Sequence, residues 1–167
     1  MKHVVFFISD ISSSGGSERI SFLVANYFIS LGHKVSFISL KRKKDKLSFD
    51  LHPSIETFTI RDRFSNPLTD VYVLRKFIKN HHIDVLIDVD SVLTPYTFLS
   101  KILSKKVKHV VWDMFNASIN LGVKRRDWGR YLGTRFADKC VVQTKEDRKQ
   151  WVETYNAKNV EVIYNPV

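Results

Sequence analysis

The chain has a single cysteine among its 167 residues, six glycines and four prolines, and far fewer acidic than basic side chains. One cysteine, Cys140, excludes an internal disulfide and is typical of a protein from a reducing compartment. It lies in the apolar run Cys140-Val141-Val142, which predicts a buried strand residue and not a nucleophile. No uninterrupted apolar run reaches the roughly 20 residues that span a bilayer. The first residues lead into a strand pattern without a small-residue cleavage site, so we expect no signal peptide.

The shortage of acidic residues leaves a formal net charge of +10. This balance implies an anionic partner: nucleic acid, an anionic membrane surface or a phosphorylated substrate. Most aromatic residues fall within apolar strand or helix patterns and do not alternate with basic residues as stacking platforms, so we expect no nucleic-acid partner. The basic run at residues 41–46 is either a solvated loop or a membrane-facing one. A predicted helix at residues 125–136 carries a second basic group, and we expect it to form a membrane or anion surface through Arg125, Arg126, Trp128 and Arg130.

Apolar strand-like segments alternate with amphipathic helical segments along the whole chain. We expect strands at residues 4–8, 34–40, 54–60, 83–89, 108–112, 139–144 and 160–164. Helices are expected at residues 18–31, 67–80, 94–106, 125–136 and 145–155. The alternation predicts an α/β fold, with a Rossmann-like, doubly wound, mostly parallel sheet of about seven strands. A chain of 167 residues suits a single domain, at residues 1–167.

A loop of small residues, 12–16, joins the first strand to the first helix, for which we predict Ser17 as the N-cap and Gly32 as the stop signal. Glycine lets a backbone approach a ligand closely, so Gly15 and Gly16 predict an anion or sugar site at this helix N-terminus. A tight turn is the other explanation of two adjacent glycines. The loop lacks the last glycine of G-x-G-x-x-G, and no acidic residue ends the second strand, so we expect no NAD.

Residues 15–35 resemble the amino-terminal signature of glycosyltransferase family 4, a large family of retaining enzymes with the GT-B fold. The likeness rests on the G-G-[AS]-E-R loop and on the helix end that follows it, and it includes Gly15, Gly16, Ser17, Glu18, Arg19, Leu31, Gly32, His33 and Val35. Three later segments continue it. Residues 136–144 are similar to A-D-x-[IV]-[IV]-x-[ST], residues 162–166 to V-I-x-N-P before the interdomain linker, and residues 112–116 to the W-E-H-F-N of one branch.

The resemblance implies the amino-terminal, acceptor-side half of a GT-B glycosyltransferase, without the C-terminal donor-binding domain. The complete hexosyltransferase would move a sugar from a nucleotide-sugar donor to a saccharide or lipid-linked acceptor, in the synthesis of a cell-surface polysaccharide or lipopolysaccharide. This half alone would be inactive. Gly15 and Gly16 would press on the diphosphate and sugar, while Asp113, Asn116 and Ser118 would line the acceptor cleft. Asp113 is the candidate catalytic group. The expected location is cytoplasmic, peripheral on the inner face of the membrane.

The sequence departs from the family pattern at residue 114, where methionine replaces a pocket-lining histidine. Methionine cannot carry a proton, so either Asp113 and Asn116 supply the polar contacts or the activity is lost. Asp88-Val89-Asp90 imitates the D-x-D manganese motif of a different glycosyltransferase fold. GT-B enzymes of this kind need no such metal, so we expect no metal and no cofactor, with the nucleotide-sugar as substrate.

Two other functions remain open from the residues. One is a non-catalytic anion-binding or regulatory Rossmann module that uses residues 41–46 and 125–135 as its binding surface. The other is an NADP-type enzyme in which Lys41 and Arg42 hold a 2′-phosphate.

Overall fold

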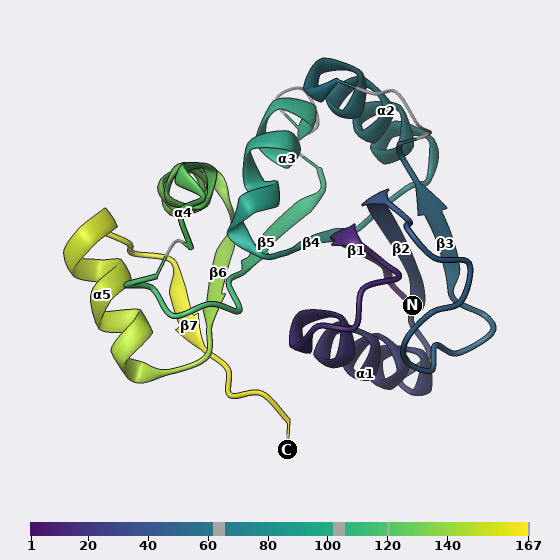
Figure 1. Ribbon diagram of the computed structural model, residues 1–167, viewed down its shortest axis with the longest axis horizontal. Helices are drawn as coiled ribbons and strands as arrows, with labels where there is room; N and C mark the ends of the chain where they lie inside the picture. Colours follow the sequence, from purple (N-terminus) through teal and green to yellow (C-terminus); the bar gives the residue numbers. More distant parts are fainter. Residues whose placement is uncertain (62–65, 102–105, 120, 167) are drawn as a thin grey trace.

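The computed structural model describes residues 1–61, 66–101, 106–119 and 121–166. Within these residues the chain forms one seven-stranded sheet in which every neighbouring pair of strands is parallel, with helices on both faces (Figure 1). The strands are β1 (His3–Asp10), β2 (Lys34–Lys41), β3 (Glu56–Thr59), β4 (Val85–Val89), β5 (Lys108–Trp112), β6 (Lys139–Val142) and β7 (Val160–Val162). The helices are α1 (Gly16–Ser30), α2 (Pro67–Asn80), the short η1 (Ser91–Leu93), α3 (Thr94–Lys101), α4 (Lys124–Phe136) and α5 (Lys145–Tyr155). The predicted Rossmann-like, doubly wound fold is confirmed.

The strands lie in the order β3-β2-β1-β4-β5-β6-β7. The chain therefore builds outward from β1 to β3, returns to the other side of β1 at β4, and builds outward again to β7. This reversal places a topological switch point between β1 and β4. In open parallel sheets, ligands bind outside the carboxyl ends of the strands at such a point.

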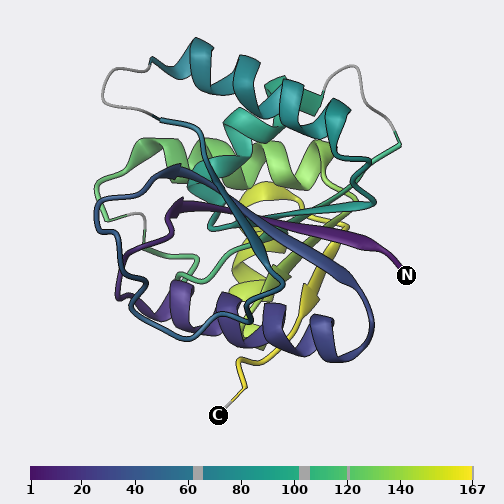
Figure 2. The same cartoon turned by 90° about the vertical axis from the view of Figure 1, so that its right-hand side faces the viewer.

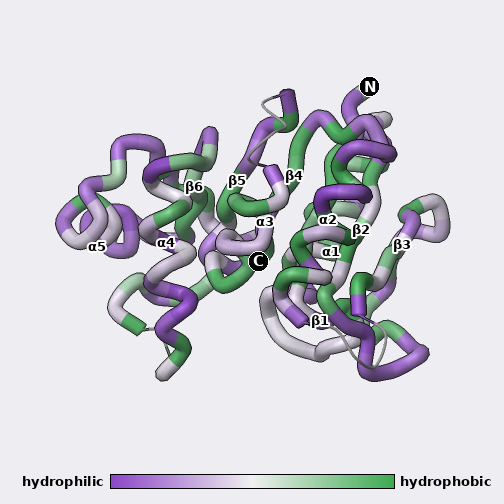
Figure 3. The backbone as a smooth tube through the Cα atoms, turned by 90° about the horizontal axis from the view of Figure 1, so that it is seen from above, coloured by the Kyte–Doolittle hydropathy of each residue, from purple (hydrophilic) through white to green (hydrophobic). Residues whose placement is uncertain are grey.

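Alternate residues of β1 supply the two faces of the core, because successive side chains of a strand point to opposite sides. Val4 and Phe6 join the cluster beneath α1, which includes Phe22. Val5 and Phe7 join the cluster beneath α2 and α3. In Figure 2 α1 lies below the sheet and α2 and α3 lie above it. Figure 3 shows hydrophobic residues concentrated along the central strands and hydrophilic residues along the outer helix α5.

Helix α1 begins two residues earlier than predicted. Its N-cap is Gly15, with no side-chain cap, so the prediction of Ser17 as the cap is wrong. Gly16 is already the first helical residue, and Glu18 lies in the first turn. Gly32 ends the helix as predicted, with a φ of 78° that glycine adopts without strain.

Several predicted boundaries shift in the structure. Strand β3 spans Glu56–Thr59 and β7 spans Val160–Val162, so both are shorter than the patterns indicate. Helix α2 begins at Pro67 as predicted, where the side chain of Asn66 accepts the N–H of Thr69 at 2.9 Å. The predicted continuation of α3 to residue 106 includes residues 102–105, which lie outside the described part of the chain.

Cys140 is completely buried in β6, as predicted. Burial raises the pKa of its thiol to about 12, which keeps the sulfur protonated and unreactive. Among the described residues, none of the helices has the length and apolar character needed to cross a membrane.

Candidate functional site

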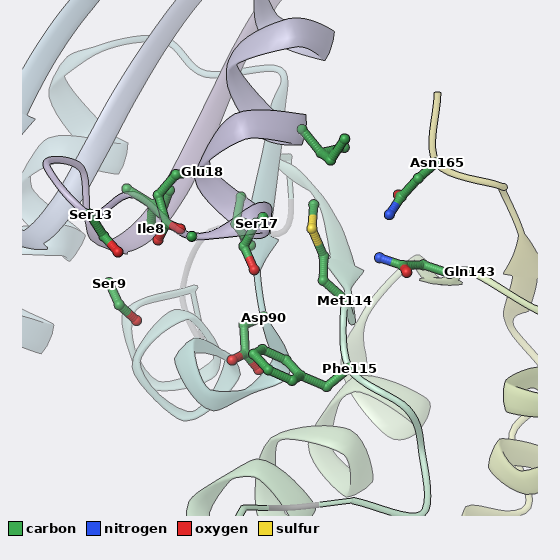
Figure 4. A pocket seen from close by; sticks show the side chains of 14 residues that line it. Ile8, Ser9, Ser13, Ser17, Glu18, Asp90, Met114, Phe115, Gln143 and Asn165 are labelled. Carbon is green, nitrogen blue, oxygen red and sulfur yellow. The ribbon is translucent and has the colours of Figure 1, made fainter. Parts of the chain in front are cut away.

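A cavity of about 560 Å³ lies at the carboxyl edge of the sheet, at the switch point between β1 and β4 (Figure 4). The segments that follow β1, β4, β5, β6 and β7 all contribute to it. It is lined by Ile8, Ser9, Ser13, Gly15, Gly16, Ser17, Glu18, Ile20, Val89, Asp90, Met114, Phe115, Gln143 and Asn165. This volume lies within the range of small-molecule sites. The fold and the cavity therefore indicate the same position for a ligand.

Gly15 and Gly16, which the sequence predicts to bind an anion or sugar, both line this cavity. A Cβ atom on Gly15 would lie 2.5 Å from the Glu18 carboxylate, so Gly15 makes room for a neighbouring side chain. A Cβ atom on Gly16 would meet no atom within 4 Å, and the φ of Gly16 is not in the left-handed region. Neither backbone strain nor packing requires a glycine at position 16. The turn explanation therefore does not account for Gly16, which leaves open space at the N-terminus of α1.

Glu18 is the buried acidic residue of the α1 N-terminus, and its side chain lines the cavity. Burial raises its pKa, and the charges of Asp10 and Asp90 act in the same direction. Hydrogen bonds from the backbone N–H groups of Glu18 and Gly15 oppose that rise. The carboxylate therefore lies near the N–H groups of Gly15 and Glu18, in the position that a capping box gives to its acidic residue.

Asp90 forms the cavity wall that follows β4, in a left-handed conformation with a φ of 90°. The Arg126 guanidinium holds both of its carboxylate oxygens, with Nη2 donating to Oδ2 at 2.8 Å and Nε to Oδ1 at 3.2 Å. The same guanidinium lies 4.2 Å from the centre of the Phe115 ring, which also lines the cavity. Arg126 therefore connects two lining residues that follow different strands.

The close approach of α4 to η1 brings Arg126 to this position. A Cβ atom on Gly129 would lie 1.7 Å from the carbonyl oxygen of Ser91, so the helix could not approach η1 with a larger residue there. Gly129 lies one turn after Arg126 on the same face of α4. The small residue lets the helix approach η1, and the approach brings the buried guanidinium of Arg126 to Asp90.

The prediction that Arg126 and Arg130 form an exposed surface is wrong, because they are 5% and 0% exposed. Arg130 donates to Asp113 at 2.6 Å and to the carbonyl oxygens of Asn116, Ala117 and Ile119 at 2.8–3.2 Å. Two carboxylates and the carbonyls of the loop after β5 thus draw these guanidinium groups inward. Arg125 and Trp128 stay exposed, and Arg125 donates to the Tyr96 hydroxyl at 2.7 Å.

The structure does not bring Asp113, Asn116 and Ser118 to the cavity wall, contrary to the prediction. Asp113 is 1% exposed and lies beneath the loop against Arg130. Burial raises its pKa to about 6, although the neighbouring guanidinium opposes that rise. Asn116 is exposed and accepts the N–H and hydroxyl of Ser118 at 2.9 and 2.6 Å. These residues shape the loop, and the candidate catalytic group is sealed from a ligand in the cavity.

Met114 and Phe115 are the residues of this loop that line the cavity. Position 114 is where the family resemblance places a pocket-lining histidine, and in this structure Met114 lines the cavity. A thioether supplies an apolar wall there and no strong hydrogen bond.

Sequence reasoning missed the polar residues of the cavity, Gln143, Asn165 and Asp90. Figure 4 shows the side chains of Gln143 and Asn165 next to each other across from Met114. Asn165 Oδ1 is buried and has no hydrogen-bond partner among the described residues, so it can accept a hydrogen bond from a ligand hydroxyl. Each of the three follows a strand end, and this common carboxyl edge is the signal that could have identified them.

The D-x-D sequence has its two carboxylates committed to different internal partners. Asp88 accepts the Thr97 hydroxyl at 2.6 Å and contacts His109 Nε2 at 2.8 Å, while Asp90 binds Arg126. Within the described ranges, no group of three or more His, Cys, Asp or Glu side chains has the arrangement to hold a metal ion.

Residues 14–167 match the family model described as Glycosyltransferase Family 4. An uncharacterized glycosyltransferase of Haemophilus influenzae is 30% identical over 170 residues, which cover 99% of this chain and 47% of that protein. The chain thus spans about half the length of this curated relative.

Several solved structures share the fold at low sequence identity. The apo lipopolysaccharide outer core galactosyltransferase WaaB has a TM-score of 0.77 at 17% identity, over 99% of this chain and 46% of that one. Anabaena HepE in complex with UDP and glucose has a TM-score of 0.72 at 13% identity, over 98% and 44%. S. aureus TarM, in complex with Fondaparinux, alpha-GlcNAc-glycerol and UDP, has a TM-score of 0.76 at 8% identity, over 100% and 62%.

Proposed function

The chain belongs to glycosyltransferase family 4, and from that premise we propose that it is the acceptor-side half of an enzyme that transfers a hexosyl group from a nucleotide-sugar donor. The acceptor is a saccharide or a lipid-linked glycan, as in cell-surface polysaccharide or lipopolysaccharide synthesis. Similar folds in HepE and TarM bind UDP, which supports a nucleotide-sugar as the donor. A second, donor-binding domain closes the cavity from the opposite side.

Gly16 carries this proposal. It lines the cavity, begins α1, and leaves open space that neither φ nor packing explains. A helix N-terminus presents free N–H groups and the positive end of the helix dipole, both of which favour a phosphate. The missing side chain lets the donor diphosphate and the transferred sugar approach the backbone.

We assign each of the remaining lining residues a role that follows from its side-chain chemistry. The side-chain carbonyl oxygen of Asn165 and the Gln143 amide form hydrogen bonds with sugar hydroxyls. The Asp90 carboxylate, held by Arg126, accepts a hydrogen bond from a further hydroxyl. Met114 supplies an apolar wall that keeps water from the reacting centre. The contribution of this half is therefore orientation of the acceptor and electrostatic stabilisation of the leaving diphosphate. We propose that no metal takes part, since Asp88 and Asp90 are engaged by His109 and Arg126.

A non-catalytic sugar-binding module is the second candidate, and Met114 favours it. The cavity has methionine where a histidine is expected, and Asp113 is sealed beneath the loop. Such a module would bind the same ligands without turnover. Transfer activity therefore separates the two candidates.

An exposed aromatic and basic surface on α4 supports a location on the inner face of a membrane. Trp128 is 68% exposed and Tyr131 50%, and Arg125 and Arg135 are exposed beside them. Aromatic and basic side chains together favour an anionic lipid interface. We propose this smaller set as the membrane surface, without the buried Arg126 and Arg130.

A transfer assay with a panel of nucleotide-sugars tests the proposal. The enzyme that contains both halves is expected to release nucleotide and transfer sugar, and Gly16→Val is expected to abolish transfer. The 167-residue chain alone is expected to give no turnover, because it supplies one wall of a two-walled cleft. Turnover by this chain alone would refute the half-enzyme proposal. Sugar binding without any transfer by the two-domain enzyme would favour the non-catalytic module.

A further inference from the structure

A second, smaller cavity of about 170 Å³ lies at the ends of β1 and β2, beside the main one. It is lined by Asp10, Ser12, Ser13, Ser14, Lys43 and Lys44, which we call the lysine notch. Ser13 lines both cavities, so the two meet at the turn after β1. We propose that the lysine notch binds a phosphoryl group carried by the acceptor. This inference rests on the proposed function and adds the chemical class of the acceptor.

The loop that carries the two lysines is fixed to the turn after β1. The backbone N–H groups of Lys43 and Lys44 donate to the Ser12 hydroxyl oxygen at 2.9 and 3.0 Å. The Ser48 hydroxyl donates to the carbonyl oxygen of Ser12 at 3.2 Å. Arg42 Nε donates to the carbonyl oxygen of Lys44 at 3.2 Å. These hydrogen bonds therefore hold the basic run beside the notch. A freely solvated loop would not need them.

The charge of the lysine notch is positive despite Asp10. Asp10 Oδ1 accepts the N–H and hydroxyl of Ser12 at 3.1 and 2.7 Å and the N–H of Lys43 at 3.4 Å. Burial would raise the pKa of Asp10, but these hydrogen bonds outweigh it and hold the pKa below its ordinary value. The carboxylate is thus ionised and holds the turn together. The notch therefore carries two positive charges, from Lys43 and Lys44, and one negative charge, from Asp10.

The side chains that remain available in the notch are two ammonium groups, which only donate, and two hydroxyls, which donate or accept. Among the described residues, no carboxylate pairs with the ammonium groups of Lys43 or Lys44. The hydroxyls of Ser13 and Ser14 likewise have no hydrogen-bond partner within the described ranges. Ammonium and hydroxyl donors around a small space match the charge and oxygens of a phosphoryl group. A neutral sugar would use the hydroxyls but would gain nothing from the two positive charges.

The position of the notch separates it from the place proposed for the donor. The donor diphosphate is assigned to the α1 N-terminus at Gly16, which lines the main cavity and not the notch. An acceptor that lies across the end of β1 could place its reacting hydroxyl in the main cavity and its phosphate in the notch. The phosphate of a sugar phosphate and that of a lipid-linked glycan share this chemistry.

Titration of the isotope-labelled chain with inorganic pyrophosphate, followed by backbone amide shifts, tests the notch. We expect saturable shifts at Ser13, Ser14, Lys43 and Lys44. Lys43→Gln/Lys44→Gln is expected to weaken this binding about tenfold, since exposed ion pairs contribute modestly each. The α5 control pair, Lys145→Gln/Lys149→Gln, removes the same charge from exposed positions on helix α5 and is expected to leave this binding unchanged. Equal weakening by both double variants, or shifts confined to Gly15 and Gly16, would overturn the proposal.

Competition identifies the source of the phosphate. Glycerol 3-phosphate, a stand-in for a phosphorylated acceptor, is expected to displace pyrophosphate from the notch. UDP and NADP are expected to leave the shifts of Lys43 and Lys44 in place. Displacement by UDP would assign the notch to the donor, and displacement by NADP alone to a 2′-phosphate, and either result would overturn the proposal. This binding needs no catalysis, so its failure is distinguishable from a failure of sugar transfer.

Discussion

Replacing Gly16 separates the requirements of the fold from those of the ligand. Gly16 is the first residue of α1, its φ is not left-handed, and an added Cβ meets no atom within 4 Å. Alanine in a helix is more favourable than glycine by up to about 1 kcal/mol, so Gly16→Ala should keep or slightly raise the free energy of unfolding. Gly16→Val should also fold, because its larger side chain enters the same open space.

Substitution of Gly16 should leave the stability unchanged or slightly higher, but it should lower the transfer activity. If the diphosphate approaches the backbone at Gly16, a side chain there displaces it and weakens its charge-assisted hydrogen bonds. Each such bond contributes about 1.5–3 kcal/mol, which corresponds to a loss of roughly ten- to hundredfold in transfer rate for Gly16→Ala. Gly16→Val should abolish transfer.

Gly32→Ala is the matched control. A Cβ on Gly32 also meets no atom within 4 Å, but its φ of 78° is one that alanine adopts at a cost of about 1–2 kcal/mol. Gly32 lies at the opposite end of α1, about 20 Å away. This variant should lose stability and keep its specific activity. Urea unfolding and transfer rates of the three variants form the assay. A fully active Gly16→Val enzyme, or one that fails to fold, would refute the reasoning.

Three further predictions concern α4 and its partners. Gly129→Ala should lower the free energy of unfolding by about 1–3 kcal/mol in urea, because its Cβ collides with the Ser91 carbonyl; an unchanged midpoint would contradict the close packing. Burial raises the pKa of Asp113 from 3.8 to about 6, so the folded chain binds this proton more tightly than the unfolded chain does. Its contribution to stability is therefore present at low pH and is lost as pH rises from about 4 to about 6, and Asp113→Asn should remove that part of the dependence measured by urea unfolding. An identical pH profile for the variant would count against it. At about 1 kcal/mol for each basic residue, Arg125→Gln/Arg135→Gln should weaken co-sedimentation with anionic vesicles roughly 30-fold at low salt, while the α5 control pair should not. Absence of wild-type binding to anionic vesicles would end the membrane proposal.

The fold could be predicted because its signals are local. Alternating apolar runs and helical stripes identified the seven strands of the described residues and helices α1 to α5, but not the short η1, and Gly32 marked the end of α1. The strand ends were predicted less well, because the pairing of a strand with its neighbour sets where the strand ends. Strand β3 pairs with β2 from Ser36 to Ser39, so its regular part ends at Thr59 although the alternating pattern continues.

The site was predicted less well because it depends on which side chains a loop turns inward. The sequence places Asp113 and Met114 side by side, but the structure buries the first beneath the loop and turns the second to the cavity. The α4 arginines were misassigned for a related reason. Charged residues on a helix usually face water, and the partners of Arg126 and Arg130 are distant in sequence. Their spacing of four, with Gly129 between them, marks one helix face and is the signal that could have revealed their burial.

The most direct test of the switch-point cavity as the substrate site is a map of backbone amide shifts as the labelled chain is titrated with a panel of nucleotide-sugars. At least one of them is expected to bind in the millimolar range and to shift the backbone amides of Gly15, Gly16 and Gln143. Gly16→Val should suppress those shifts, while the remaining amide signals should still be those of the folded chain. Shifts that map away from the carboxyl edge of the sheet, or that persist unchanged in Gly16→Val, would contradict the account.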